Sequence, residues 1–347
     1  MQKEGNPYGL HRVIEPKNIL PQAALRVDNN FSDIYDNEIL CNVTHLNIDA
    51  ASFAVIKERA QNDITKIKEI ILDIVSKYGK HKNPWTGSGG IFIGEVEKIG
   101  ERLRGKINLE NGNKIASLVS LSLTPLRIDE IKSVNIENDQ VEIKGQALLF
   151  ESGVWVKLPN DLPQKLSLAV LDVAGAAGQV KRLVSKGDTV AILGARGKSG
   201  LICCYQAKQS AGPEGRVIAV IHQEKGKEDV ENAPFVDDVI IAKADQALDV
   251  YEQIVQLTQG KLCDAVVSCV SRENCEMSAI LSTRQRGKIY FFSMATSFTK
   301  AALGAEGVGK DIDMLIGNGY CAGHAELTLD IIRKSDYIRD LYTQRYC

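Results

Sequence analysis

The stretch KGDTVAILGARGKSGLICCYQAK, residues 186–208, decides the fold. Its apolar run 189–193 has the composition of a buried strand, a glycine-rich turn follows directly, and a helix is expected to begin near Leu201. Glycines let the backbone turn tightly and approach a pyrophosphate, whose charge is attracted by the N–H groups at the helix N-terminus. The stretch therefore predicts a dinucleotide site, with Gly194, Ala195, Arg196, Gly197, Lys198, Ser199 and Gly200 as candidate binding residues.

The chain after this stretch supports a parallel sheet. Strand-like runs recur at 216–221, 239–241, 265–269, 288–292 and 314–316, and helical stretches separate several of them. Strands that alternate with helices predict a parallel, doubly wound sheet. Two strand ends are then expected to reach the cofactor, with Ser268, Cys269 and Val270 at the nicotinamide ribose and Ser293, Met294 and Ala295 at the ring or its carboxamide.

The adenosine end leaves the choice between NAD and NADP open. NAD enzymes usually place Asp or Glu after the second strand of this sheet, where it binds the ribose hydroxyls. This chain has His222 and Gln223 there, with Lys225 and Lys227 beyond them. The missing acid removes one obstacle to a 2′-phosphate, and the lysines either help to hold that phosphate or are simply solvated.

The first half of the chain is β-rich. Short alternating runs at 38–43, 91–99, 114–118, 140–143 and 154–158 are broken by glycine, asparagine and proline. Because 347 residues are too many for one comfortable core, two domains are expected.

Two segments raise the question of a lid over a site. Apolar residues recur at helical spacing between 54 and 78, which predicts a helix that packs on a sheet or a partner subunit rather than a lid. The glycine-rich stretch 304–309 is interpreted either as a loop that closes over a ligand, with Glu306 or Lys310 contributing, or as a plain surface loop. A helical segment is also expected at 166–183.

Composition excludes several classes of function. A formal net charge of −2 gives no electrostatic footprint for nucleic acid or an anionic membrane, and no apolar run is long enough to span a bilayer. The N-terminal segment is polar, unlike a signal peptide. The eight cysteines include no C-x-x-C pair, which favours reduced thiols in a cytoplasmic protein over disulfides or a cysteine metal site.

The order of these parts resembles the medium-chain dehydrogenase/reductase superfamily, and 187–200 looks like the glycine loop of its zinc-free branch. The resemblance implies an α/β fold with a GroES-like β-barrel catalytic domain (1–157 and 323–347, with a helical insertion near 56–78) and a Rossmann domain, a doubly wound parallel sheet (158–322). It also implies a homodimer, joined edge to edge near 314–316. Zinc relatives carry ligands at stretches that match 46–52 and 87–90, where this chain has neither cysteine nor histidine, so no metal is expected.

Longer segments give a closer resemblance, to the L-erythro-3,5-diaminohexanoate dehydrogenase family. They are NPYGLHRVIEPK (6–17), TGSGGIFIGEV (86–96), ASLVSLSLTPLRI (116–128), FFSMATSFTKAALGAEGVGKD (291–311) and IGNGYCAGHAELTLDI (316–331). The resemblance implies NAD(P)-dependent oxidative deamination of this small diamino acid to 5-amino-3-oxohexanoate and ammonium, a step of lysine fermentation. The competing interpretations are a zinc-free quinone or enoyl reductase and a non-catalytic dinucleotide-binding sensor.

Such a deamination needs a base for the amine and partners for a second ammonium and a carboxylate. Asp172 interrupts the apolar run 166–178, where a carboxylate is costly unless paired, and is the favoured base or ammonium partner. Asp49 falls where zinc relatives keep a ligand, and it is interpreted equally as a functional residue, a base or an ammonium partner, or as a cap on a turn.

Three further residues are candidates for binding the substrate. Arg12 is expected either to clamp the carboxylate or to pair with Glu15. His11, in the same polar segment, is a secondary candidate because a lone histidine is more often structural. Glu151 is a third acidic candidate, although a glutamate near a turn is usually a surface residue.

Overall fold

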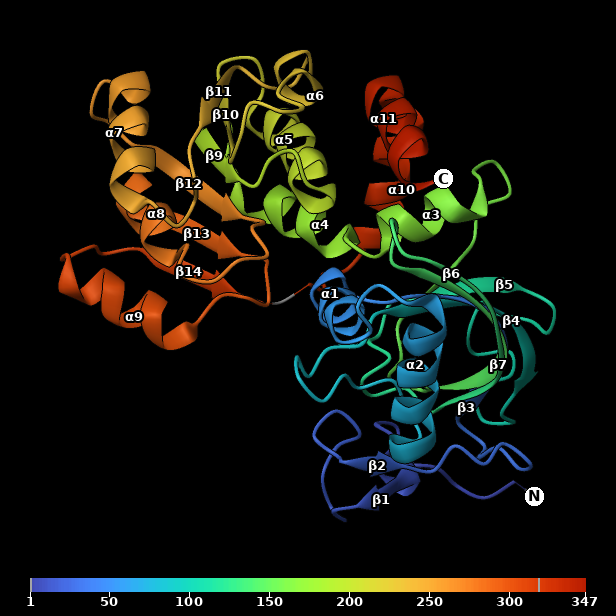
Figure 1. Cartoon of the computed structure of the whole chain (residues 1–347). Coiled ribbons are helices and arrows are strands. Elements are labelled where there is room, and N and C mark those ends of the chain that lie inside the picture. The colour runs from blue at the N-terminus through green and yellow to red at the C-terminus, as the bar shows by residue number, and fades with distance from the viewer. Residues whose placement is uncertain (1, 318) are drawn as a thin grey trace. The chain divides into compact units, whose positions relative to one another are not determined.

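The computed structural model describes residues 2–317 and 319–347, which form two compact units (Figure 1). Unit 1 is Met1–Asp172 and unit 2 is Val173–Arg345. These units differ from the domain limits that we expected at 157/158 and 322/323. Helix α3 (Gln164–Leu171) groups with unit 1, whereas the C-terminal helices group with unit 2 because α10 (His324–Lys334) packs against α4 (Ala174–Leu183) and α5 (Lys198–Ala211).

Unit 1 is built on an antiparallel sheet with the strand order β6-β7-β3-β4-β5-β8. The strands are β3 (Glu38–Asn47), β4 (Ile91–Ile99), β5 (Lys114–Ser117), β6 (Leu126–Asn135), β7 (Gln140–Phe150) and β8 (Trp155–Lys157). The sequence did not indicate β6, because this edge strand buries few of its side chains and carries charges where alternation would place apolar residues. Unit 1 also contains a separate two-stranded antiparallel sheet, formed by β1 (Val13–Glu15) and β2 (Arg26–Val27).

The helical insertion of unit 1 is two helices, α1 (Ala50–Arg59) and α2 (Ile64–Tyr78), rather than one. The chain breaks at Gln61 and Asn62, whose φ values are 53° and 59°, and Asp63 then caps α2 by accepting the N–H groups of its first turn. Buried apolar side chains of α2 pack this helix against β6 and β2. The predicted packing of this segment on a sheet is therefore confirmed.

Unit 2 contains a parallel sheet with the order β11-β10-β9-β12-β13-β14. Its strands are β9 (Thr189–Leu193), β10 (Arg216–Ile221), β11 (Asp238–Ile241), β12 (Cys263–Ser268), β13 (Thr283–Phe291) and β14 (Asp313–Ile316). Figure 1 shows α7 (Ala247–Thr258) and α8 (Glu276–Ser282) on one face of this sheet and α4 and α5 on the other. The predicted doubly wound sheet is confirmed, and its strand order reverses between β9 and β12, where such folds bind ligands.

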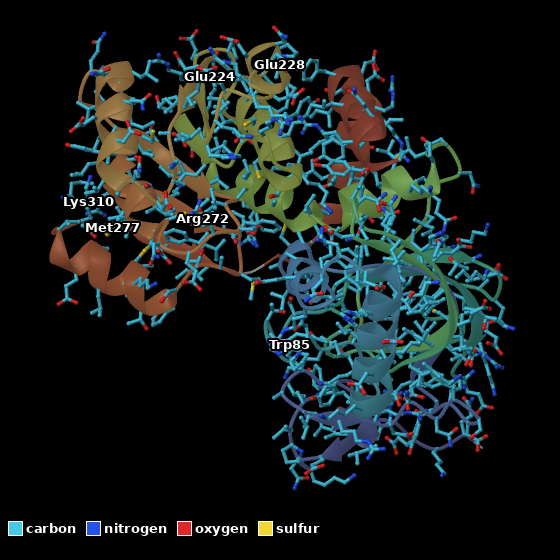
Figure 2. The ribbon with its side chains drawn as sticks, in the orientation of Figure 1. Trp85, Glu224, Glu228, Arg272, Met277 and Lys310 are labelled. Carbon is cyan, nitrogen blue, oxygen red and sulfur yellow. The ribbon has the colours of Figure 1, made fainter. Side chains whose placement is uncertain are left out.

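The structure corrects two local expectations in unit 2. Residues 304–307 belong to helix α9 (Phe298–Gly307) rather than to a loop, because Gly304 lets α9 pack closely against Met277 of α8. Lys310 lies beside this helix (Figure 2), and its Nζ donates to the backbone oxygen of Thr283 at 2.5 Å. The segment 166–183 is also not one helix, since α3 ends before Asp172 and α4 begins after Val173.

The remaining helices of unit 2 are α6 (Glu228–Glu231) and α11 (Asp336–Tyr346). No helix in residues 2–317 and 319–347 has both the length and the apolar character needed to cross a membrane.

Candidate functional site

The glycine-rich turn after β9 has the geometry of a pyrophosphate cradle. Gly194 has a φ of 78°, and a Cβ atom at Gly200 would lie 2.2 Å from the backbone oxygen of Gly194. Only glycine at 200 allows this contact, which holds the start of α5 against the end of β9. Gly197 stands at the N-cap of α5 and has no side chain with which to cap the first turn. The helix N-terminus is thus shaped for the negative charge of a dinucleotide pyrophosphate.

The C-terminal helix α11 forms a brace for this turn, by which we mean its hydrogen bonds to the backbone oxygens of the turn. The Tyr342 hydroxyl donates to the backbone oxygen of Lys198, and Arg345 Nη1 donates to that of Arg196 at 2.9 Å. Asp229 accepts bonds from both Arg345 and the Arg196 side chain, whose Nε lies 2.8 Å from Asp229 Oδ2. Sequence reasoning missed this brace, because its partners are up to 149 residues apart and no local pattern links them.

The strand ends that we predicted to face the nicotinamide meet at the edge of the sheet beside Gly194. Ser268 pairs in register with Leu193, and the N–H of Cys269 donates to the oxygen of Leu193 at 2.9 Å. Val270 packs so closely that a Cβ at Gly194 would lie 3.1 Å from its side chain. After β13, Ser293 is buried and its Oγ accepts the N–H of Ala295, whereas Met294 is 74% exposed.

The segment after β10, which we predicted to lie beside the adenosine ribose, is exposed at its first residues. His222 is exposed, and Figure 2 shows Glu224 and Glu228 in unit 2 where β10 leads toward α6. Arg196 reaches this turn, since its Nε also donates to the oxygen of Gly226 at 3.0 Å. The glycine turn and the segment after β10 are therefore joined through one arginine.

In unit 1, the structure brings together two stretches that the sequence singled out separately. Asp49 precedes α1, and its Oδ2 accepts the N–H of Gly89 at 2.8 Å. Gly90 has a φ of 112°, and a Cβ there would lie 2.0 Å from the oxygen of Asn47, so this close approach requires glycine. Asp49 is half-buried at the N-terminus of a helix, where a carboxylate is favoured.

A buried histidine of this region was not indicated by the sequence. The His81 side chain is fully buried, and neither ring nitrogen makes a hydrogen bond of standard geometry in the described part of unit 1. Burial lowers the pKa of His81 to about 4, so its imidazole is neutral at pH 7. Two residues further on, Asn83 donates to the Ser52 hydroxyl of α1 at 2.7 Å and ties the segment to the start of that helix.

Asp172, the favoured base or ammonium partner, stands at the C-terminal cap of α3 and is half-buried. Its backbone N–H donates to the oxygen of Leu168 at 3.2 Å, so the backbone there is still helical. The carboxylate therefore lies at the break between two helices rather than inside one.

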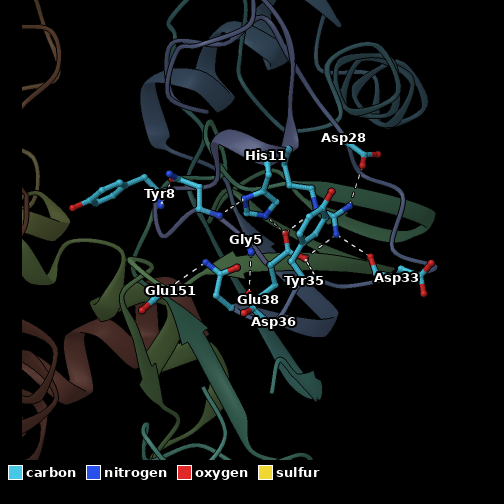
Figure 3. A network of polar contacts seen from close by, with 12 residues as sticks. Gly5, Tyr8, His11, Asp28, Asp33, Tyr35, Asp36, Glu38 and Glu151 are labelled. Atoms are coloured by element: carbon cyan, nitrogen blue, oxygen red, sulfur yellow. Dashed lines mark hydrogen bonds and ion pairs between the residues drawn. The ribbon is translucent and has the colours of Figure 1, made fainter. Parts of the chain in front are cut away.

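Arg12 is a buried residue with a different partner from the one we expected (Figure 3). Its Nε and Nη2 donate to the two carboxylate oxygens of Glu38 at 2.8 and 2.7 Å, and Glu15 plays no part in this pair. The remaining N–H groups donate to Asp28 and to the backbone oxygens of Asn30 and Asp33. Every guanidinium donor is thus engaged inside the protein, which makes Arg12 a poor clamp for a substrate carboxylate in this arrangement.

His11 belongs to the same network. Its Nδ1 accepts the N–H of Asn6 at 2.9 Å, so the proton lies on Nε2, which donates to Glu38 at 2.8 Å. The ring also stacks at 4.3 Å from that of Tyr35. Both histidine nitrogens therefore have structural partners.

Glu38 is the centre of this network. Burial alone would raise the pKa of Glu38, but the hydrogen bonds from Arg12 and His11, the charge of Arg12 and the N–H of Tyr35 outweigh it and hold that pKa below its ordinary value. Because the folded value is lowered, the carboxylate contributes stability above pH 4.5 and loses it as the pH falls through the folded pKa.

Glu151 lies at the edge of the same region and is a partly exposed ion-pair residue. Its Oε2 accepts from Arg102 Nη2 at 2.8 Å. It also accepts from Asn37 at 3.4 Å (Figure 3). The surface role that the sequence allowed for Glu151 agrees with this geometry. Within residues 2–317 and 319–347, no three His, Cys, Asp or Glu side chains are grouped so that they could hold a metal ion.

We expect Glu38→Gln to lower the free energy of unfolding by about 3–5 kcal/mol at pH 7, because the buried guanidinium of Arg12 then loses its buried charge partner and keeps only the partly exposed Asp28. Urea unfolding followed by circular dichroism measures the change, and Glu15→Gln is the matched control because Glu15 is exposed. The difference between wild type and Glu38→Gln should shrink below pH 4.5. Equal stability of the two variants at pH 7 would contradict the network.

We expect Arg345→Met to weaken dinucleotide binding by roughly three- to tenfold, because the loss of a charge-assisted bond to the turn costs about 1 kcal/mol. Titration of the reduced cofactor by its fluorescence measures the dissociation constant. Arg339→Met is the control, since Arg339 pairs with Asp336 on the exposed side of the same helix. If both variants bind as the wild type does, the brace has no role in the site.

Comparisons with known proteins agree with this geometry. The N-terminal domain model of L-erythro-3,5-diaminohexanoate dehydrogenase matches residues 11–159. The chain is 56% identical over 343 residues to the L-erythro-3,5-diaminohexanoate dehydrogenase of Acetoanaerobium sticklandii, covering 99% of both chains. It is 51% identical over 344 residues to the enzyme of the same name from Fusobacterium nucleatum, again covering 99% of both.

A mycobacterial protein solved in complex with NADPH shares the fold, with a TM-score of 0.58 and 15% identity over 94% of each chain. This likeness confirms the predicted fold class, an antiparallel GroES-like unit followed by a Rossmann sheet, and the chain is an oxidoreductase. The identity to the two dehydrogenases extends over nearly the whole length of each, so the chain belongs to the L-erythro-3,5-diaminohexanoate dehydrogenase family.

Proposed function

We propose that this chain catalyses the NAD(P)-dependent oxidative deamination of L-erythro-3,5-diaminohexanoate, which gives 5-amino-3-oxohexanoate and ammonium in lysine fermentation. The observation that carries the proposal is the 56% identity, over 99% of both chains, to a dehydrogenase of that name. The glycine cradle of unit 2 supports the same reading, since its contacts fit a pyrophosphate.

The residues of unit 1 have the chemistry that this reaction requires. A bound nicotinamide would accept the hydride from C3 of the substrate. The 3-amino group must first lose a proton, and Asp49 is our choice for the base because its carboxylate is held in place by Gly89 beside a helix N-terminus. We assign the 5-ammonium group to Asp172, whose half-buried carboxylate lies at a helix break. A water molecule then attacks the C3 imine carbon and releases ammonium.

The N-terminal network has a supporting role in this proposal. The hydrogen-bonding groups of Arg12 and His11 are occupied by Glu38 and its neighbours, and Glu151 forms an ion pair with Arg102. We propose that they fix the N-terminal segment rather than contact the substrate.

The cofactor is NAD or NADP, and the structure offers a reason to test both. No carboxylate directly follows β10, where His222 is exposed, and Arg196 lies within reach of the same turn. An arginine there would favour a 2′-phosphate, but Asp229 and Gly226 already hold its Nε.

We also propose that the protein is a homodimer and that it works in the cytoplasm. Strand β14 is the outer strand of the unit 2 sheet, and pairing of two such edges would join two chains into a homodimer. All eight cysteines carry free thiols, which is typical of the cytoplasm.

The decisive assay mixes the purified protein with 3,5-diaminohexanoate and either NAD or NADP. It measures the absorbance of the reduced nicotinamide that forms. A chelator is present throughout. We expect reduction of at least one cofactor, with ammonium released in equal amount, and no effect of the chelator. Cofactor binding without turnover of the diamino acid would overturn the deaminating function, and quinone and enoyl substrates would then be tested.

Replacing Asp49 by Asn should lower kcat by about 100- to 10,000-fold, the usual contribution of a general base, and leave the dissociation constant of the cofactor unchanged. The matched control is Asp63→Asn, because Asp63 also stands at a helix N-terminus but caps α2. If the two variants lose activity equally, Asp49 acts as a cap and not as the base.

A further inference from the structure

Two thiols are in contact beside the glycine turn of the dinucleotide cradle. Cys269 follows β12 directly, Cys203 lies in α5, and their sulfur atoms are 3.9 Å apart. The two residues are 66 positions apart in the chain, so the fold and not local sequence brings them together.

The two thiols differ in their access to solvent. Cys203 is fully buried, whereas Cys269 is partly exposed. Burial raises the pKa of Cys203 well above that of a free thiol, so Cys203 is protonated at pH 7. An oxidant from solution therefore meets Cys269 first, and Cys203 stands behind it as the second thiol.

We infer that Cys269 and Cys203 form an oxidation site, in which a hydroperoxide converts the two thiols to a disulfide that disables dinucleotide binding. The inference concerns the cradle itself and does not depend on the substrate proposed above.

The chemistry balances with the hydroperoxide as the oxidant. The Cys269 thiolate attacks the terminal peroxide oxygen, the O–O bond breaks, and a sulfenic acid and an alcohol (water, from hydrogen peroxide) are formed. The Cys203 sulfur then attacks the sulfenic sulfur, and the S–O bond breaks. The departing hydroxide takes the proton of Cys203 and leaves as water. Two thiols are oxidised, and one peroxide is reduced.

The geometry explains why such a bond would affect the cofactor. A disulfide requires a sulfur–sulfur distance of about 2.05 Å, so the two sulfur atoms must approach by nearly 2 Å from their present 3.9 Å. The Cys269 N–H is bonded to Leu193, and the next residue, Val270, packs on Gly194. Drawing Cys269 toward α5 would therefore displace the contacts on which the glycine turn rests. Protein interiors are tightly packed and do not absorb such a shift without change.

The test uses the full-length reduced protein, hydrogen peroxide as the oxidant, and two readouts that need no turnover. Intact mass and peptide mapping identify the cross-link, and fluorescence titration gives the dissociation constant of reduced cofactor. We expect a loss of two hydrogens per chain, a peptide joining Cys203 to Cys269, and at least tenfold weaker binding that dithiothreitol restores. Saturating reduced cofactor added beforehand should slow the oxidation.

Variants separate this pair from the other thiols. Cys203→Ala should form no disulfide and leave a sulfenic acid on Cys269 that dimedone traps. Cys263→Ala is the matched control, because Cys263 is a buried thiol at the start of β12, the strand that Cys269 follows, and should behave as the wild type does. A cross-link through Cys204, no cross-link in the wild type, or full binding by the oxidised protein would each overturn the inference.

Discussion

The absence of a side chain at Gly200 is the constraint on which unit 2 depends. The backbone oxygen of Gly194 occupies the space that a Cβ would need, at 2.2 Å. This contact lets α5 begin directly above β9, the strand at which the order of the parallel sheet reverses. The uncapped helix N-terminus is thereby presented at the carboxyl edge of the sheet, and the same face of α5 carries Cys203 against Cys269 one turn later. One steric requirement thus sets the pyrophosphate cradle and the position of the thiol pair.

Unit 1 contains two kinds of polar cluster, and hydrogen-bond satisfaction distinguishes them. In the Glu38 network, both carboxylate oxygens, both nitrogens of His11 and every donor of Arg12 have protein partners. Such a network is complete, and its role is to hold the N-terminal segment on the sheet. The hydrogen bonding around Asp49 is less complete, because neither ring nitrogen of buried His81 makes a hydrogen bond of standard geometry in the described part of the chain.

Sequence reasoning succeeded where the signal is local. The limits of β4, β9 and β10 match the apolar runs, because buried strands are bounded by turn residues that the chain itself displays. It failed for β6, where an edge strand needs few apolar side chains, and for α9, where glycines suggested a loop but allow close helix packing. The choice of Glu15 as the partner of Arg12 failed for a related reason, since Glu38 lies 26 residues away and is brought near only by the fold.

In the candidate site, too, the sequence predicts the local features but not the contacts between distant parts of the chain. The glycine turn could be located from seven consecutive residues, whereas its brace by Tyr342 and Arg345 comes from the far end of the chain. The fold is shared with a mycobacterial protein at 15% identity, so the fold itself tolerates almost complete replacement of the sequence. Identity of 51–56% to the two dehydrogenases therefore reflects more than the demands of the fold. In segment 86–96, Gly89 donates its N–H to Asp49 and the missing side chain of Gly90 leaves room for the oxygen of Asn47, so this turn positions a carboxylate at the start of α1, which is a feature of the candidate site and not of the sheet.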